Sequence, residues 1–196
     1  MQSADVGGPV GADRETVAVR AVVLELEKVT ASAGWDQPAR LFALVRTERL
    51  LADQPDLARM LEVDPDSDLT GSLTPVEQDD VPSDQHLEAF LTELAWPPAV
   101  HGAAVVVERL VLPPSVELPE DDGEAQQIAA THPDRQDVRM VAAATREGAT
   151  YCALRLRSHD EDLAVVQGVD LVPALLELLQ ATLAPDRQPE PETRDG

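Results

Sequence analysis

Apolar side chains recur every three or four positions in three long stretches of the chain, which is the spacing of one helix face. The first stretch follows Asp13, a good N-terminal cap, and ends before Gly34, a residue that terminates helices. The others follow Asp84 and Asp170, and Pro173 then falls in a first turn, where proline is tolerated. The pattern predicts three main helices over residues 13–33, 84–95 and 170–184, and shorter helical segments at 47–52, 56–61 and around 124–131.

Continuous apolar runs predict the strands. Residues 40–46 form a short run, and residues 100–112 are apolar at both alternating sets of positions, which is typical of a central strand covered on both faces. Residues 137–146 and 149–158 flank Glu147-Gly148 and predict a β-hairpin. We therefore expect an α+β fold, with a mixed, largely antiparallel sheet flanked by helices.

The expected hairpin register follows from treating Glu147-Gly148 as a two-residue turn, which sets Met140 opposite Arg155. The core face then holds Val141, Ala143, Cys152, Leu154 and Leu156, and the semi-polar face holds Tyr151, Arg155 and Arg157. On the core face, the Cys152 thiol is expected to be buried filler with a raised pKa.

Three stretches lack a hydrophobic pattern. Residues 1–12 and 185–196 are rich in glycine, proline and charge, and predict disordered tails. Residues 62–83 are the longest unpatterned interior stretch, either a surface excursion or the join between two subdomains. We therefore expect a single α+β domain over residues 13–184, with a division at 62–83 left open.

The charge of the chain excludes several partners. The sequence has 37 acidic and 15 basic residues, a net charge of −22, which has the wrong sign for binding nucleic acid or an anionic membrane. No apolar run approaches the roughly 18 residues of a membrane helix, and the N-terminus does not resemble a signal peptide. A single cysteine excludes an internal disulfide, so we expect a cytoplasmic protein. Since Lys28 is the only lysine, the composition also indicates a high-GC bacterium.

Charged residues interrupt the apolar strands at Glu108, Arg109, Arg155 and Arg157. Charges on buried strands need partners, so one interpretation is a structural ion pair between Glu108 and an arginine, with Arg155 as the expected partner. The other is a pocket that binds an anion or a carboxylate. Its candidate residues are Arg155, Arg157, His159, His101, Glu108 and Tyr151.

Other motifs give no catalytic, metal or cofactor assignment. The segment from Asp66 to Glu77 matches an EF-hand loop in register, but Pro75 and Pro82 oppose the flanking helix, so a solvated acidic loop is expected. The four histidines have no partner at zinc-ligand spacing. They are His86, His101, His132 and His159. Nucleophile elbows, Walker loops and dinucleotide-binding glycine motifs are missing.

Five segments resemble an actinobacteria-restricted family of conserved signature proteins with no assigned activity. They are Trp96–Gly102, Val107–Pro114, His132–Arg135, Tyr151–Arg157 and Gly168–Pro173. The resemblance covers about residues 35–184. It implies an actinobacterial source and assigns no functional residue.

Two functions remain open at the level of sequence. The first is a non-catalytic cytoplasmic binding or regulatory module that acts through protein contacts. Helix 170–184 supports it, because its leucines cover more than one face and predict a protein partner or a homodimer. The alternative is a small-anion-binding protein or an enzyme, with its site around Arg155, Arg157, His159, His101 and Glu108.

Overall fold

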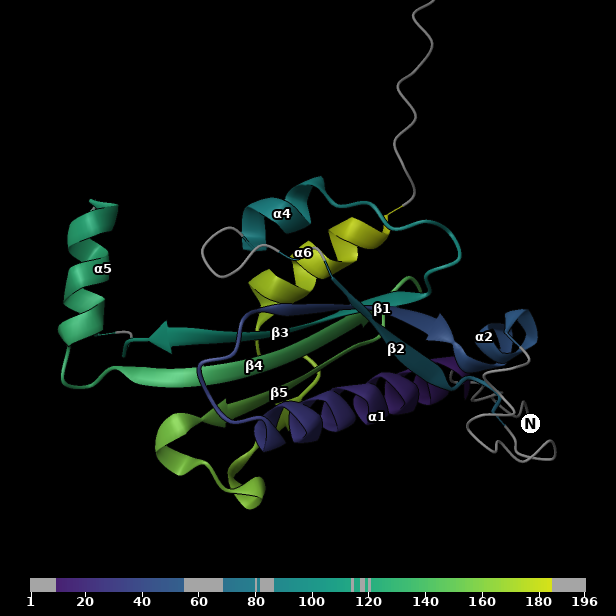
Figure 1. Ribbon diagram of the computed structural model, residues 1–196, viewed down its shortest axis with the longest axis horizontal. Coiled ribbons are helices and arrows are strands. Elements are labelled where there is room, and N and C mark those ends of the chain that lie inside the picture. The colour runs from purple at the N-terminus through teal and green to yellow at the C-terminus, as the bar shows by residue number, and fades with distance from the viewer. Residues whose placement is uncertain are drawn as a thin grey trace, which may run out of the picture.

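The computed structural model describes residues 10–54, 69–79, 81, 87–113, 115, 116, 119 and 121–184. Its centre is an open six-stranded sheet in the order β2-β1-β3-β4-β5-β6, with every neighbouring pair antiparallel (Figure 1). The strands are β1 (Arg40–Arg46), β2 (Leu73–Gln78), β3 (Gly102–Val111), β4 (Gln136–Thr145), β5 (Thr150–Leu156) and β6 (Val166–Gly168). The expected α+β class is confirmed.

Helices cover both faces of the sheet (Figure 1). Helix α1 (Val10–Ser32) crosses one face, and α4 (Leu87–Glu93) and α6 (Pro173–Leu183) pack on the other. Helix α2 (Thr47–Asp53) follows β1, and α5 (Asp122–Thr131) stands beyond the far end of β3 and β4. Two short 3₁₀ turns, η1 (Arg157–His159) and η2 (Asp162–Ala164), connect β5 to β6.

The start of α6 differs from the expectation. Val172 is the N-cap and Pro173 is the first helical residue, so Asp170 does not cap this helix. Proline is preorganised for the first helical position, and it fixes the start there. Helix α1 also begins earlier than expected, at Val10, so residues 10–12 of the predicted tail 1–12 are helical and Asp13 lies inside the helix rather than at its N-cap. Residues 1–9, the predicted tail 185–196, the predicted helix 56–61 and the predicted cap Asp84 lie outside the described residues.

Strand β3 is central and buried on both faces, as its pattern predicts. The side towards α4 and α6 packs Ala103, Val105 and Val107 with Leu91 and Leu179. The side towards α1 packs Ala104 and Val106 with four residues of α1, Val19, Val22, Val23 and Leu26. Small alanines at the middle of the sheet let helices on both sides approach closely, so the chain builds its core with few aromatic residues.

The β4–β5 hairpin is shifted by one residue from the expected register. Its loop has three residues, because the Gly148 amide donates to the Thr145 carbonyl (3.0 Å) and Gly148 adopts a φ of 87°. A three-residue loop that ends in a left-handed residue adds one position to a two-residue turn. Ala143 therefore pairs with Tyr151, and Arg139 pairs with Arg155.

The shift corrects the assignment of faces. Val141 and Ala143 lie on the α1 side with Tyr151 and Arg155, and Cys152 lies on the other side with Ala142. Both faces are covered by helices, so neither is the semi-polar face that the two-residue turn predicts. Cys152 is buried, and this burial raises the pKa of its thiol, as expected.

Strands β2 and β6 form the two edges of the sheet, and the hydrophobic pattern did not predict either of them. Strand β2 lies within the unpatterned stretch 62–83 and contains Pro75, which an edge strand tolerates because one side has no ladder to complete. The end of the EF-hand-like segment belongs to β2, where Glu77 pairs with Arg40 at 2.6 Å. Residues 66–68 of that segment lie outside the described residues.

Candidate functional site

Three arginines gather on the α1 side of the sheet, where the sequence placed the candidate pocket. Arg139 on β4 and Arg155 on β5 are register partners, and both are buried. Arg157 follows in η1 and is exposed. Such charges are stable on a covered face only with partners of opposite charge, so the identity of those partners decides what the cluster can do.

Arg155 pairs with α1 and not with Glu108. Its Nε and Nη2 donate to the two carboxylate oxygens of Glu27 at 2.5 and 3.2 Å, and Glu27 is itself buried. The same guanidinium also donates to Asp160 at 3.2 Å and to Asp162 at 2.9 Å. These carboxylates, Glu27 foremost, raise the pKa of Arg155 further above its usual range.

Glu108 accepts hydrogen bonds from Arg139, a residue that the sequence analysis did not single out. Arg139 Nη2 and Nε lie 2.8 and 3.1 Å from one oxygen of Glu108, and the Asp36 amide donates to the other at 2.8 Å. Arg139 also donates to the Gly34 carbonyl and lies over the Trp35 ring, 4.4 Å from its centroid. Glu108 and Arg139 are direct cross-strand partners, so correct pairing of β3 with β4 would have identified the pair.

The loop after α1 closes the cluster. Asp36 accepts two hydrogen bonds from Arg157, at 2.7 and 2.8 Å, which lower the pKa of the Asp36 carboxyl. Trp35 Nε1 donates to Asp160 at 2.9 Å, and this bond, together with Arg155, lowers the pKa of Asp160. Each guanidinium of this three-arginine cluster therefore already has a carboxylate partner, which leaves little positive potential for a bound anion.

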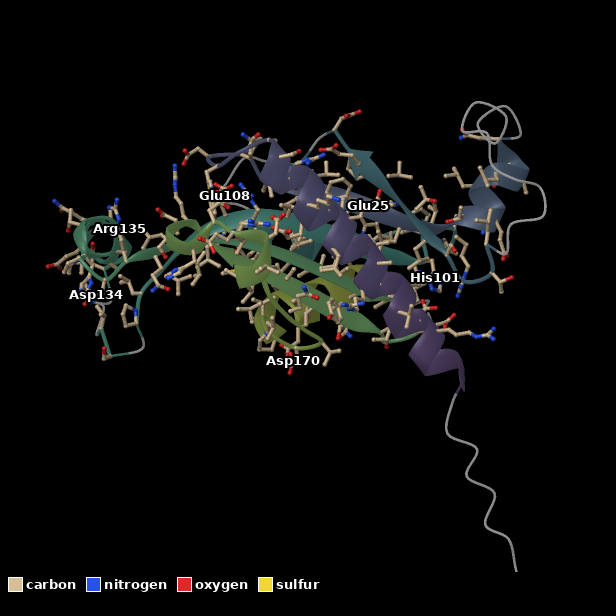
Figure 2. The ribbon with its side chains drawn as sticks, turned by 90° about the horizontal axis from the view of Figure 1, so that it is seen from below. Glu25, His101, Glu108, Asp134, Arg135 and Asp170 are labelled. Carbon is tan, nitrogen blue, oxygen red and sulfur yellow. The ribbon has the colours of Figure 1, made fainter. Side chains whose placement is uncertain are left out.

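The remaining predicted residues have other partners, although His159 lies in η1 beside Arg157. His159 is exposed and contacts Ser158, and the Tyr151 hydroxyl accepts from Arg20 at 3.1 Å. His101 lies towards the opposite end of the molecule from Glu108 (Figure 2). The seven residue steps from His101 to Glu108 along β3 correspond to about 23 Å at the usual rise of a strand. The fold therefore does not gather the predicted set into one pocket.

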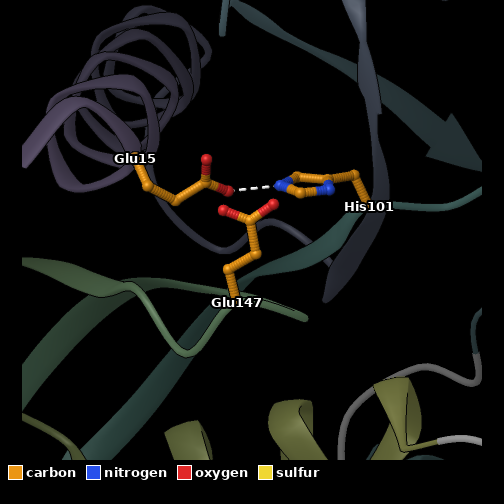
Figure 3. A group of neighbouring side chains, drawn as sticks. All are labelled: Glu15, His101 and Glu147. Atoms are coloured by element: carbon orange, nitrogen blue, oxygen red, sulfur yellow. Dashed lines mark hydrogen bonds and ion pairs between the residues drawn. The ribbon is translucent and has the colours of Figure 1, made fainter. Parts of the chain in front are cut away.

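A second polar cluster surrounds His101, at the end of the sheet where β3 begins. It brings Glu15 of α1 and Glu147 of the hairpin loop to His101 (Figure 3). Arg46, at the end of β1, pairs with both of these glutamates. Nε2 of His101 contacts Glu15 Oε1, and Nη2 of Arg46 lies 3.2 Å from Nε2, 2.9 Å from Glu147 and 3.5 Å from Glu15. The exposed fractions of the Glu15, His101 and Glu147 side chains are 6%, 12% and 57%.

Backbone hydrogen bonds hold this second cluster in place. The His101 amide donates to the Leu44 carbonyl at 2.8 Å, and the Arg146 amide donates to the His101 carbonyl at 2.9 Å. His101 is thereby fixed between β1 and the hairpin loop, although it lies just before β3. No local motif announces this cluster, because the contact between Glu15 and His101 spans 86 positions of sequence.

The third feature is an apolar groove of about 310 Å³ on the opposite side of the sheet, between α4, α6 and the strands β3 and β4. Its lining includes Val107, Met140, Val172, Leu175 and Leu178. One rim carries an ion pair between Arg109 and Glu88, 2.8 Å apart. Arg109, which interrupts the apolar pattern of β3, thus lies at the mouth of this groove.

The leucines of α6 divide between two surroundings. Leu176, Leu179 and Leu183 are buried towards the sheet and α4, and Leu175 and Leu178 line the groove. The leucines of helix 170–184 cover more than one face, and α4 of the same chain therefore buries part of the surface that the sheet leaves uncovered. The exposed side of α6 carries Pro173, Ala174, Glu177, Gln180 and Ala181.

Comparison with known proteins identifies a family. No helix in the described part of the chain is both long and apolar enough to span a membrane. No curated protein and no solved structure matches the chain. The family model described as PPA1309-like protein matches residues 19–184, which include both polar clusters except Glu15, and the whole groove. The match extends over most of the chain, and the protein therefore belongs to the family of PPA1309-like proteins.

Proposed function

We propose that this chain is a non-catalytic binding module of an actinobacterial cytoplasm, which acts through protein contacts at the groove between α4 and α6. The observation that carries the proposal is the groove itself, an apolar concavity of about 310 Å³ on a strongly charged protein. That volume lies at the lower end of ligand pockets, and it suits one or two large apolar side chains. Exposed apolar concavities with a polar rim are typical of interaction sites.

The net charge indicates the kind of partner. At −22 the chain attracts basic surfaces and repels a second copy of itself. Glu88 at the rim is about half exposed, so it is accessible to a cation from a partner. We therefore assign to the groove a basic protein segment that inserts apolar side chains between α4 and α6.

The alternative, an anion-binding protein or enzyme around Arg155, Arg157, His159, His101 and Glu108, has weaker support. The three arginines on the α1 side are neutralised by Glu27, Glu108 and Asp36, together with Asp160 and Asp162. His101 lies well apart from Glu108 along β3 (Figure 2). A site there would first have to break ion pairs that hold α1 and its following loop on the sheet.

The test uses two labelled helical peptides, one built of leucine and lysine and the other of leucine and glutamate. Their binding to the full chain is followed by fluorescence anisotropy. Ala174 is exposed and lies on the lip of the groove, so Ala174→Trp fills the groove without disturbing the core. Ala181→Trp is the matched control, because Ala181 is exposed on the same helix and does not line the groove.

We expect the lysine peptide to bind the wild type and Ala181→Trp equally, and Ala174→Trp to bind about tenfold more weakly. The glutamate peptide should not bind. Equal binding of the lysine peptide to both tryptophan variants would contradict the proposal. The other possible occupant is a second copy of the chain, which light scattering would detect as a dimer. A dimer of the wild type and of Ala181→Trp that Ala174→Trp does not form would place that second copy in the groove instead of a basic segment.

A further inference from the structure

Glu15, His101 and Glu147 bring three potential metal ligands together from three separate elements (Figure 3). Their ligand atoms, one imidazole nitrogen and two carboxylate oxygens, all lie within 4.8 Å of one another. A zinc ion binds nitrogen and oxygen ligands at about 2.0–2.2 Å, which sets tetrahedral ligands about 3.4 Å apart. Small rotations of the two flexible glutamate side chains would therefore close the set around one ion.

A cationic group already lies against these ligands. Nη2 of Arg46 is 2.9 Å from Glu147, 3.5 Å from Glu15 and 3.2 Å from Nε2 of His101. Two carboxylates held near each other, one of them almost fully buried, need a nearby positive charge. The Arg46 side chain is 34% exposed, so it can turn towards solvent if another cation takes this place.

Arg46 does not satisfy every polar atom of the cluster, because Nε2 of His101 faces both a donor, Arg46, and an acceptor, Glu15. If Nε2 carries a proton, it donates to Glu15 but opposes the N–H groups of Arg46. If Nε2 is deprotonated, it accepts from Arg46 but turns its lone pair towards the Glu15 carboxylate. No single protonation state of this nitrogen satisfies both neighbours. A metal ion removes the conflict, because a neutral imidazole and a carboxylate can both coordinate the same cation.

The burial of the ligands suits binding and access. Glu15 and His101 form a wall that is largely shielded from water, with exposed fractions of 6% and 12%. Glu147, 57% exposed on the hairpin loop, provides the open side through which an ion arrives. A set of one nitrogen and two oxygens is suited to first-row transition metals, and three protein ligands leave a coordination position for water.

We propose that Glu15, His101 and Glu147 bind one divalent transition-metal ion, for which zinc and cobalt are the probes. Binding would displace Arg46 and join α1, the start of β3 and the β4–β5 loop through one ion. No short-spaced ligand motif marks this site in the sequence. These three ligands are brought together only by the tertiary fold.

The experiment titrates the full chain, first stripped with a chelator, with Co²⁺ followed by visible absorption. Competition with Zn²⁺ then gives the zinc affinity. His101→Asn removes a ligand without changing the formal charge, and Glu147→Gln removes the exposed ligand on the hairpin loop. The matched controls are His159→Asn and Glu161→Gln, which change an exposed histidine and an exposed glutamate outside the cluster. Arg46→Gln removes the competing cation.

We expect one equivalent of Co²⁺ with the absorption of a nitrogen- and oxygen-coordinated ion. His101→Asn and Glu147→Gln should each weaken zinc binding by about tenfold or more, whereas Arg46→Gln should strengthen it and the controls should match the wild type. Circular dichroism verifies that every variant is folded. The proposal would be overturned if both His101→Asn and Glu147→Gln bound zinc as tightly as the wild type. It would also be overturned if the wild type bound several Co²⁺ ions weakly and none of them distinctly more tightly than the rest.

Discussion

Single residues hold α1 to the sheet, and the arginines of the three-arginine cluster differ in how much they contribute. Arg155→Ala leaves the buried Glu27 carboxylate without its charged partner, so we expect a loss of about 3–5 kcal/mol in the free energy of unfolding. Arg157→Ala is the matched comparison and should lose far less, because water solvates its exposed pair with Asp36. Urea denaturation measures both, and equal losses would contradict the assignment of Glu27 as a buried charge.

The same cluster predicts how stability depends on pH. Trp35 and Arg155 lower the pKa of Asp160 below the usual 3.8, so the folded state binds that proton more weakly than the unfolded state. The carboxylate therefore stabilises the fold above the usual pKa, and this contribution disappears as the pH falls through the lowered folded value. As the pH is lowered below about 4, the urea concentration at the midpoint of unfolding should fall in the wild type. It should fall less in Asp160→Asn. Asp134→Asn, an exposed aspartate outside the cluster, should follow the wild type.

Individual partners could not be predicted from the sequence where they depend on distant segments. Charges at Glu108 and Arg155 were recognised as needing partners, because both interrupt apolar strands. Glu27, however, lies 128 positions from Arg155, on a helix whose polar positions look like any solvated helix face. The same reason hid Glu15 and Glu147, which become neighbours of His101 only after α1 and the hairpin have docked.

Among the secondary-structure elements, the start of β3 depends on a close approach of two backbones. A Cβ added at Gly102 would lie 2.6 Å from the carbonyl oxygen of Ala144 on β4. Because that oxygen belongs to the backbone, the strands must separate, and Gly102→Ala should lose about 1–3 kcal/mol in the free energy of unfolding. Denaturant melts test this, and stability equal to the wild type would mean that the β3–β4 ladder can open at no cost.

The sequence predicted the inner elements of the sheet better than its edges and its register. Strand β1 matches its expected bounds of 40–46, because an apolar run there ends at charged residues. The hairpin register was missed because Ala142 and Ala143 are equally suited to either face, so alternation cannot distinguish a two-residue from a three-residue loop. Strand β2 was missed because Pro75 and its polar neighbours resemble a loop, although an edge strand tolerates them.

For the whole molecule, the net charge of −22 predicts a response to salt. Repulsion between surface carboxylates disfavours the compact state, and salt screens it. The buried pairs, such as Arg155 with Glu27, are screened much less. Sodium chloride at about 0.5 M, where the Debye length is only a few ångströms, should therefore raise the midpoint of thermal unfolding. A lower midpoint in salt would mean that exposed ion pairs outweigh the repulsion.

The two tryptophans lie on opposite sides of the sheet and offer a separate optical signal for each layer. Trp35 packs against Arg139 and Arg157 on the α1 side, whereas Trp96 packs against the core on the other side and its amide donates to the Thr182 carbonyl of α6. Fluorescence of Trp96→Phe would then follow the layer of α1, and that of Trp35→Phe the layer of α4 and α6. Because β3 and β4 supply both cores, neither layer can detach without exposing the same strands. The two emission changes should coincide across a denaturant series, so the sheet and both of its helical layers unfold as one cooperative unit.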